Sequence, residues 1–168
     1  MELFYYPKKQ NHKSADTDVL ILTSVGAFCE KNSLSAYSGK VLRTPLGKPY
    51  LENNYLFTGV THTSDVIIVG VCEKSFGIDC ESKNRVIKNP ERIINRFFTD
   101  NEKRFILSSK DKQQAFLEIW VKKEAYLKYT GDGISGLCNC DVTKIYGFTK
   151  IQNDKNLIIY IYEDNSNG

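Results

Sequence analysis

The sequence predicts an α+β fold in which two groups of short strands flank a helical middle. Apolar, β-branched runs with strand-like patterning occupy residues 1–6, 55–80 and 144–162, whereas capped segments with helical spacing fill residues 89–130. The chain has 168 residues, of which 41% are hydrophobic and 26% charged, as in an ordinary globular protein with its own core. We therefore expect one compact domain or two small fused half-domains.

The first half begins with an expected edge strand over residues 1–6. Residues 16–31 contain an apolar run that suits a strand, but the length of the whole stretch favours a helix. Proline and glycine predict a turn at residues 45–49. Three short β-branched or aromatic runs separated by polar turns then predict a three-stranded meander, over residues 55–61, 66–73 and 76–80.

The helical middle is marked by its caps. Asn89 is followed by Pro90 and Glu91, which predicts a capping side chain, a proline at the first helical position and an acid at the positive end of the helix dipole. Thr99 and Glu102 have the spacing of a capping box, so a second helix is expected to begin there.

A third and longest helix is expected over residues 111–130, because Gly131 then provides a favourable left-handed C-cap. After a glycine-rich loop, residues 144–151 and 157–162 predict a final hairpin around residues 153–154.

Positive charge is concentrated in the helical middle. The net charge of the chain is only +3, but residues 83–128 contain 12 basic and 6 acidic residues. Such a zone favours an anionic partner, which could be nucleic acid, a phosphorylated cofactor or an acidic protein. By itself the pattern is more typical of a solvated helical face than of a binding surface.

The cysteines and the hydropathy of the sequence indicate in which compartment of the cell the protein is expected. The five cysteines are an odd number without the spacing of a disulfide framework, so we expect reduced thiols. No apolar run approaches the roughly 18 residues of a membrane span, and Glu2 stands where a signal peptide favours positive charge. These features predict a cytoplasmic protein with no membrane contact.

The longest predicted helix carries a stripe that changes character along its length. Phe116, Trp120, Glu124 and Lys128 are spaced four apart and therefore lie on one side. A Glu and a Lys at this spacing usually form a plain surface pair. Trp120 favours a functional role for Glu124, because an aromatic ring that prefers burial lies on the same side of the helix as this acid.

A second candidate site is the sequence GIDCE at residues 77–81. The two-residue period of a strand places Asp79 and Glu81 on one face, where like charges call for a compensating cation unless both are solvated. A hard divalent ion is the natural candidate, and Glu124 could supply a third oxygen ligand. The alternative is a solvent-facing strand end.

Taken in order, these segments resemble the motifs of the 4′-phosphopantetheinyl transferases, specifically the surfactin-synthetase-activating type in a short form. The resemblance is carried by GKPYL (47–51), THT (61–63), FGIDCE (76–81), RFFTDNE (96–102), WVKKEAYLK (120–128) and GDGIS (131–135). It covers about residues 45–137 strongly and the remainder in outline.

The resemblance implies a magnesium-dependent enzyme that moves the phosphopantetheine arm of coenzyme A onto a serine of an apo acyl or peptidyl carrier protein, releasing adenosine 3′,5′-bisphosphate. Such carriers serve fatty-acid, polyketide or nonribosomal-peptide synthesis. The implied fold has two pseudo-symmetric α/β halves with the active site in the cleft between them. Here these would be a shortened N-terminal half, residues 1–74, and residues 75–168, which carry most of the metal-binding and catalytic positions.

Carried over by position, Asp79, Glu81 and Glu124 are the implied Mg²⁺ ligands. Glu124 is also the implied general base, and Lys128 matches the lysine that contacts the pyrophosphate, so these two are the implied catalytic residues. For Glu102, the capping-box role is sufficient.

Coenzyme A is expected to contact Lys48, Thr61, His62 and Lys128. The short first half lacks the Arg- and Lys-rich stretch that helps related enzymes to hold the 3′-phosphate, and its possible substitutes are Lys8, Lys9, Lys13 and Arg43.

The carrier protein is expected to dock on the basic middle, with steering from Lys83, Arg85, Arg92, Arg96, Lys110 or Lys112. We expect a monomer that binds no nucleic acid. Two alternatives remain at this point: a metal-dependent phosphohydrolase that acts on a nucleotide pyrophosphate with the same acids, and a non-catalytic nucleotide-binding relative.

Overall fold

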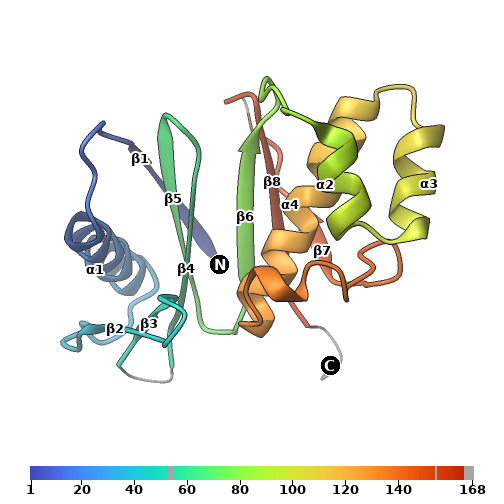
Figure 1. Cartoon of the computed structure of the whole chain (residues 1–168). Helices are drawn as coiled ribbons and strands as arrows, with labels where there is room; N and C mark the ends of the chain where they lie inside the picture. Colours follow the sequence, from blue (N-terminus) through green and yellow to red (C-terminus); the bar gives the residue numbers. More distant parts are fainter. Residues whose placement is uncertain (53–54, 154, 165–168) are drawn as a thin grey trace. The chain divides into compact units, whose positions relative to one another are not determined.

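The computed structural model describes residues 1–52, 55–153 and 155–164, and the chain divides into two compact units, Met1–Phe76 and Gly77–Gly168 (Figure 1). Each unit combines a three-stranded antiparallel sheet with helices, which confirms the predicted α+β class.

Unit 1 contains one long helix and two small sheets. Its elements are β1 (Glu2–Pro7), α1 (Ser14–Lys31), β2 (Val41–Arg43), β3 (Pro49–Leu51), β4 (Phe57–His62) and β5 (Val66–Cys72). The main sheet has the order β1-β5-β4, and β2 pairs with β3. The edge strand at the N-terminus and the helix expected over residues 16–31 are therefore confirmed.

The core of unit 1 lies between α1 and the main sheet. Ile21, Val25 and Phe28 recur every three or four residues, so they form one buried face of α1. This face packs in one cluster with alternate residues of β5, namely Ile67, Val69 and Val71.

Unit 2 contains β6 (Gly77–Ser82), α2 (Pro90–Phe97), α3 (Asp100–Ser108), α4 (Lys112–Thr130), the 3₁₀ turn η1 (Ile134–Gly136), β7 (Phe148–Lys150) and β8 (Leu157–Tyr162). Its sheet has the order β6-β8-β7, with α4 packed against β6 and β8. In both units the first strand pairs with the last, and the last pairs with the one before it. The two sheets therefore share a topology.

The predicted three-stranded meander is wrong at its third strand. β4 and β5 pair as expected, but β6 belongs to the sheet of unit 2, where Asp79 lies opposite Tyr160 of β8. All six residues of β8 are buried, as is typical of a central strand, and β8 has β6 on one side and β7 on the other. Closeness in sequence suggested the wrong partner, because the true partner follows some 80 residues later.

Of the two predicted N-caps, the capping box of α3 is confirmed, because Thr99 Oγ1 accepts a hydrogen bond from the Glu102 N–H at 3.3 Å. α4 has an N-cap that was not predicted, Asp111, whose carboxylate accepts from the Gln114 N–H at 2.9 Å. At α2, however, Asn89 makes no side-chain cap: it adopts a left-handed conformation with φ 53°. Proline at the next position disfavours the ordinary helical region for Asn89, and asparagine tolerates the left-handed one.

The C-terminal end of α4 and the final hairpin follow the prediction in outline. α4 ends at Gly131, which has φ 83°, as a left-handed C-cap requires. The first strand of the hairpin is shorter than the predicted 144–151, and Asp154 lies outside the described residues. Within the described part of the chain, no helix has the length and apolar character needed to cross a membrane.

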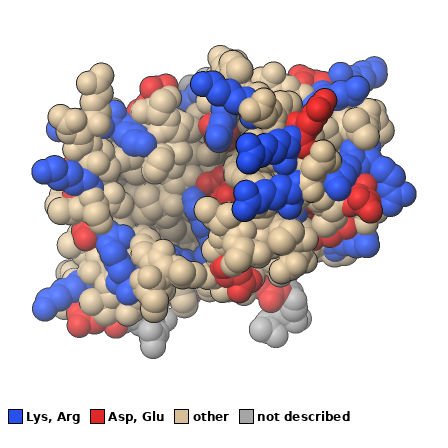
Figure 2. Space-filling model, viewed as in Figure 1, with Lys and Arg blue, Asp and Glu red and all other residues tan. Residues whose placement is uncertain are grey.

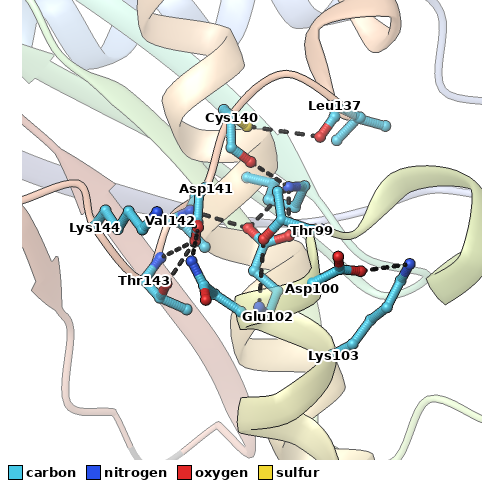
Figure 3. A network of polar contacts seen from close by, with 12 residues as sticks. Thr99, Asp100, Glu102, Lys103, Leu137, Cys140, Asp141, Val142, Thr143 and Lys144 are labelled. Carbon is cyan, nitrogen blue, oxygen red and sulfur yellow. Dashed lines mark hydrogen bonds and ion pairs between the residues drawn. The ribbon is translucent and has the colours of Figure 1, made fainter.

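A buried ion pair holds α3, α4 and the loop after η1 together (Figure 3). Glu102 and Lys123 are both fully buried, with Lys123 Nζ 2.7 and 2.8 Å from the two carboxylate oxygens. The carboxylate also accepts from the backbone N–H groups of Thr99 at 2.8 Å and Val142 at 2.9 Å, and Lys123 donates to the Cys140 carbonyl. Charges this deeply buried are tolerated because every one of these bonds is made.

Glycine allows β6 to approach α4 closely. A Cβ atom at Gly77 would lie 2.0 Å from the carbonyl oxygen of Ala125 and 2.7 Å from the backbone nitrogen of Tyr129. No side chain fits there, so the strand and the helix backbone are in direct contact. Because residues alternate along a strand, Asp79 and Glu81 share the helix-facing side with Gly77.

We predict that Lys123→Met destabilises the protein by about 3–5 kcal/mol, because it leaves the Glu102 carboxylate buried without its counter-ion. The measurement is equilibrium unfolding in urea. Combining Lys123→Met with Glu102→Leu should recover part of the loss, since the double variant buries no charge. A single variant within about 0.5 kcal/mol of the wild type would contradict the structural role assigned to the pair.

We predict that Gly77→Ala destabilises the protein by about 1–3 kcal/mol, because the added methyl group forces β6 away from α4. Gly26→Ala is the matched control: Gly26 lies in α1, and nothing lies within 4 Å of an added Cβ there. That change should stabilise the helix by up to about 1 kcal/mol. Thermal unfolding of both variants checks the prediction, which fails if their melting temperatures move together.

Candidate active site

Four of the predicted site residues meet in unit 2. Asp79 and Glu81 lie on β6 and face α4, while Glu124 and Lys128 lie one turn apart on α4. The close approach at Gly77 brings this strand face to the helix. The structure therefore brings together the two segments that the sequence marked as chemical.

Lys128 pairs with Asp79 across the strand and helix. Its Nζ lies 2.7 Å from Asp79 Oδ1, and Asp79 is only 8% exposed. The surface pair between Glu124 and Lys128, considered above as the plain alternative, is not among the ion pairs of the described residues. Burial explains the preference of Lys128, because Asp79 is buried and needs a counter-ion more than the half-buried Glu124 does.

Glu124 stands beside this pair as a half-buried acid. Among the residues that the structure describes, its carboxylate makes no hydrogen bond and no ion pair. Burial raises the pKa of Glu124, and the nearby charge of Asp79 raises it further, whereas Lys128 and Arg85 oppose the shift. A carboxylate whose pKa is raised towards neutrality is a better proton acceptor than an ordinary one.

Glu81 is engaged by a residue that was not predicted for this site. Its Oε2 forms an ion pair with Arg85, and its Oε1 accepts from the Ser82 N–H at 2.9 Å. Arg85 had been placed only among the cations expected to steer the carrier protein. The two-residue period of a strand does not predict this contact, because Arg85 lies in the turn after β6 and not in the strand.

The donor set fits a divalent cation by its chemistry. Asp79, Glu81 and Glu124 offer only carboxylate oxygens, which are the protein ligands that Mg²⁺ prefers. The described residues contain no group of three or more His, Cys, Asp and Glu side chains already arranged to hold a metal ion. The ion pairs account for this arrangement, since Lys128 and Arg85 each engage one of the three acids.

The remaining predicted residues lie in unit 1. Lys48 follows the β2–β3 turn, and Thr61 and His62 end β4, with Thr61 buried and His62 exposed. Lys8 Nζ lies 3.0 Å from His62 Nδ1 and donates to the Thr63 carbonyl at 3.2 Å. Of the four cations considered as substitutes for the missing basic stretch, Lys8 therefore contacts a predicted coenzyme-binding residue.

The role of Lys123 was not predicted, although the sequence contains a signal for it. Phe116, Ile119, Lys123 and Leu127 have the spacing of one helix face and are all buried, so a lysine within this series indicates a buried partner. Its partner Glu102 has a saturated carboxylate, which makes that residue structural rather than a proton acceptor.

Comparisons with known proteins agree on one family. Residues 75–159, just over half of the chain, match the model of the 4′-phosphopantetheinyl transferase superfamily. The transferase HetI of Nostoc sp. (strain PCC 7120) is 30% identical over 138 residues, which are 80% of this chain and 57% of the relative.

Two further relatives carry the same enzyme name. The 4′-phosphopantetheinyl transferase gsp of Aneurinibacillus migulanus is 29% identical over 90 residues, 52% of this chain and 36% of the relative. Psf-1 of Bacillus pumilus is 34% identical over 92 residues, 53% of this chain and 38% of the relative. The chain thus spans about half or less of the length of these relatives. The match to the family model, which includes β6, α4 and the acids between them, shows that the chain belongs to the 4′-phosphopantetheinyl transferase superfamily.

Proposed function

We propose that this protein transfers the 4′-phosphopantetheine arm of coenzyme A to a serine of an apo acyl or peptidyl carrier protein. The observation that carries the proposal is the arrangement of Asp79, Glu81, Glu124 and Lys128 on the facing sides of β6 and α4. Family membership supports the same chemistry.

The reaction needs a stronger nucleophile and a stabilised leaving group. The serine oxygen forms a bond to the β-phosphorus of the pyrophosphate, and the bond from that phosphorus to the bridging oxygen breaks, so that adenosine 3′,5′-bisphosphate departs. Glu124 is suited to accept the serine proton, because its pKa is raised by burial. Lys128 provides positive charge for the oxygens that become more negative.

We propose that Asp79, Glu81 and Glu124 hold the Mg²⁺ ion of this reaction. When bound, a divalent ion neutralises the negative charge of phosphate oxygens and orients them. The protein contributes the close approach of β6 and α4, which places the strand that carries two of the acids against the helix that carries the third.

In unit 1, we propose that Lys8 and His62 bind the 3′-phosphate of coenzyme A. Lys8 Nζ donates a hydrogen bond to His62 Nδ1 at 3.0 Å, so the lysine charge is held next to the imidazole ring. A positive charge held in this way suits a phosphate.

We propose that the carrier protein docks on the basic surface of α2 and α3. Figure 2 shows Lys and Arg side chains gathered over these helices, and Arg92, Arg96 and Arg104 are exposed there. Phe105 and Leu107 of α3 are 46% and 67% exposed, so apolar contact area accompanies the charge. An acidic partner would be steered to this surface by long-range attraction.

We propose that the protein acts as a monomer in the cytoplasm. All five cysteines, each within the described part of the chain, are free thiols, as is typical of a reducing compartment. Two units with the same strand order within one chain support the monomer.

We predict that apo carrier proteins incubated with coenzyme A and Mg²⁺ gain one phosphopantetheine mass in intact-protein mass spectrometry. Removing the metal with EDTA should abolish the gain, and added Mg²⁺ should restore it. Asp79→Asn should lower the rate about 100-fold, as expected for the loss of one preorganised electrostatic group, while Glu30→Gln, an exposed acid of α1, should have no effect.

The same experiment separates the alternatives. Turnover of coenzyme A without a carrier protein would favour the phosphohydrolase. Binding of coenzyme A without turnover on any carrier of a broad panel would favour the non-catalytic relative.

We predict that Lys8→Ala weakens the binding of coenzyme A about tenfold, the effect of one charge-assisted hydrogen bond. Binding of 3′-dephospho-coenzyme A should not change, because this ligand lacks the phosphate. Calorimetric titration of both ligands measures the difference, with Lys74→Ala, a change at another exposed lysine of unit 1, as the control. Equal loss for the two ligands would show that Lys8 does not recognise the 3′-phosphate.

A further inference from the structure

We propose that Arg85 competes with the divalent cation for Glu81, so that metal binding requires Arg85 to be displaced. The inference rests on the proposed function, because it concerns the same metal site. It assigns a role to a residue outside the motifs that carry the family resemblance.

The position of Arg85 is fixed by its backbone rather than by its side chain. Its N–H donates to the Ser82 carbonyl at 3.1 Å, which closes the turn after β6. Its carbonyl accepts from Gln113 Nε2 of α4 at 3.2 Å. Arg85 is therefore tied both to the end of β6 and to α4, the two elements that carry the acids.

The guanidinium reaches into the acidic site from this anchored position. It pairs with Glu81 Oε2, and its charge also acts on Glu124. Glu81 keeps 15% of its side chain exposed and Arg85 51%, so the pair lies at the solvent edge of the site. A metal ion that enters from solvent would thus find the Arg85 guanidinium already paired with Glu81, one of the expected ligands of the ion.

Charge balance gives the physical reason for such a competitor. Asp79, Glu81 and Glu124 carry up to three negative charges in a partly buried place, and two cations, Lys128 and Arg85, offset most of this charge. A divalent ion brings two positive charges to the same acids. Metal and guanidinium therefore satisfy the same need, and the binding of one disfavours the other.

The exposure of Arg85 makes the exchange inexpensive. A half-exposed ion pair is screened by solvent and contributes little stability, and the released guanidinium can be hydrated. Lys128 differs, because only 34% of its side chain is exposed, against 51% for Arg85. We therefore assign the competition at Glu81 to Arg85.

The test is Mn²⁺ binding to the intact protein without coenzyme A, followed by the electron paramagnetic resonance signal of the free ion. Arg85→Gln should tighten Mn²⁺ binding about fivefold, which corresponds to the upper range for exposed ion pairs. Arg85→Lys, which retains the charge, should stay closer to the wild type. Lys83→Ala controls for the general loss of positive charge, because Lys83 is an exposed lysine two residues away.

A second comparison isolates the contact itself. In a Glu81→Gln background, Arg85→Gln should change Mn²⁺ affinity no more than Lys83→Ala does. If Arg85→Gln leaves or weakens Mn²⁺ affinity in the wild-type background, or matches Lys83→Ala there, the inference is wrong. A wild-type protein that binds no Mn²⁺ would instead overturn the proposed metal site, and the two failures are thus distinguishable.

Discussion

The arrangement of the candidate active site depends on the direct contact between the backbone of β6 and that of α4. A glycine at position 77 is the only residue type that leaves room for the Ala125 carbonyl and the Tyr129 nitrogen. That contact brings the acids of β6 to the helix, because Asp79 and Glu81 stand two and four residues further along the same strand face. A longer gap between strand and helix would separate the acids of β6 from Glu124 without changing a single functional group.

Charge is the second constraint on unit 2, and the protein meets it in two different ways. Deep in the core, the side chains of Glu102 and Lys123 are fully hydrogen-bonded to each other and to the surrounding backbone. Neither charged group is therefore available for catalysis. At the β6–α4 site, cations offset the acids only partly, and Glu124 has a raised pKa and a carboxylate that no described residue engages. The first arrangement stabilises a fold, whereas the second leaves binding capacity for a ligand.

Local patterns predicted much of this structure, and non-local pairing accounts for what they missed. The capping box at Thr99 and the stop of α4 at Gly131 depend on neighbouring residues, so short sequence windows contain the required information. The partner of β6 could not be found that way, because a strand pattern states that a strand exists and not which strand it joins. Likewise, Arg85 meets Glu81 through a turn whose geometry the two-residue period does not describe.

The strand order of the two sheets also has a consequence for synthesis on the ribosome. In unit 1 the last strand, β5, is complete by Cys72, so this unit can close while the rest of the chain is still being made. β6 must wait for β8, its neighbour in the sheet of unit 2, which begins only at Leu157. Unit 2 should therefore fold late and in one step, and its nascent form should be the stage at which the chain is most dependent on chaperones.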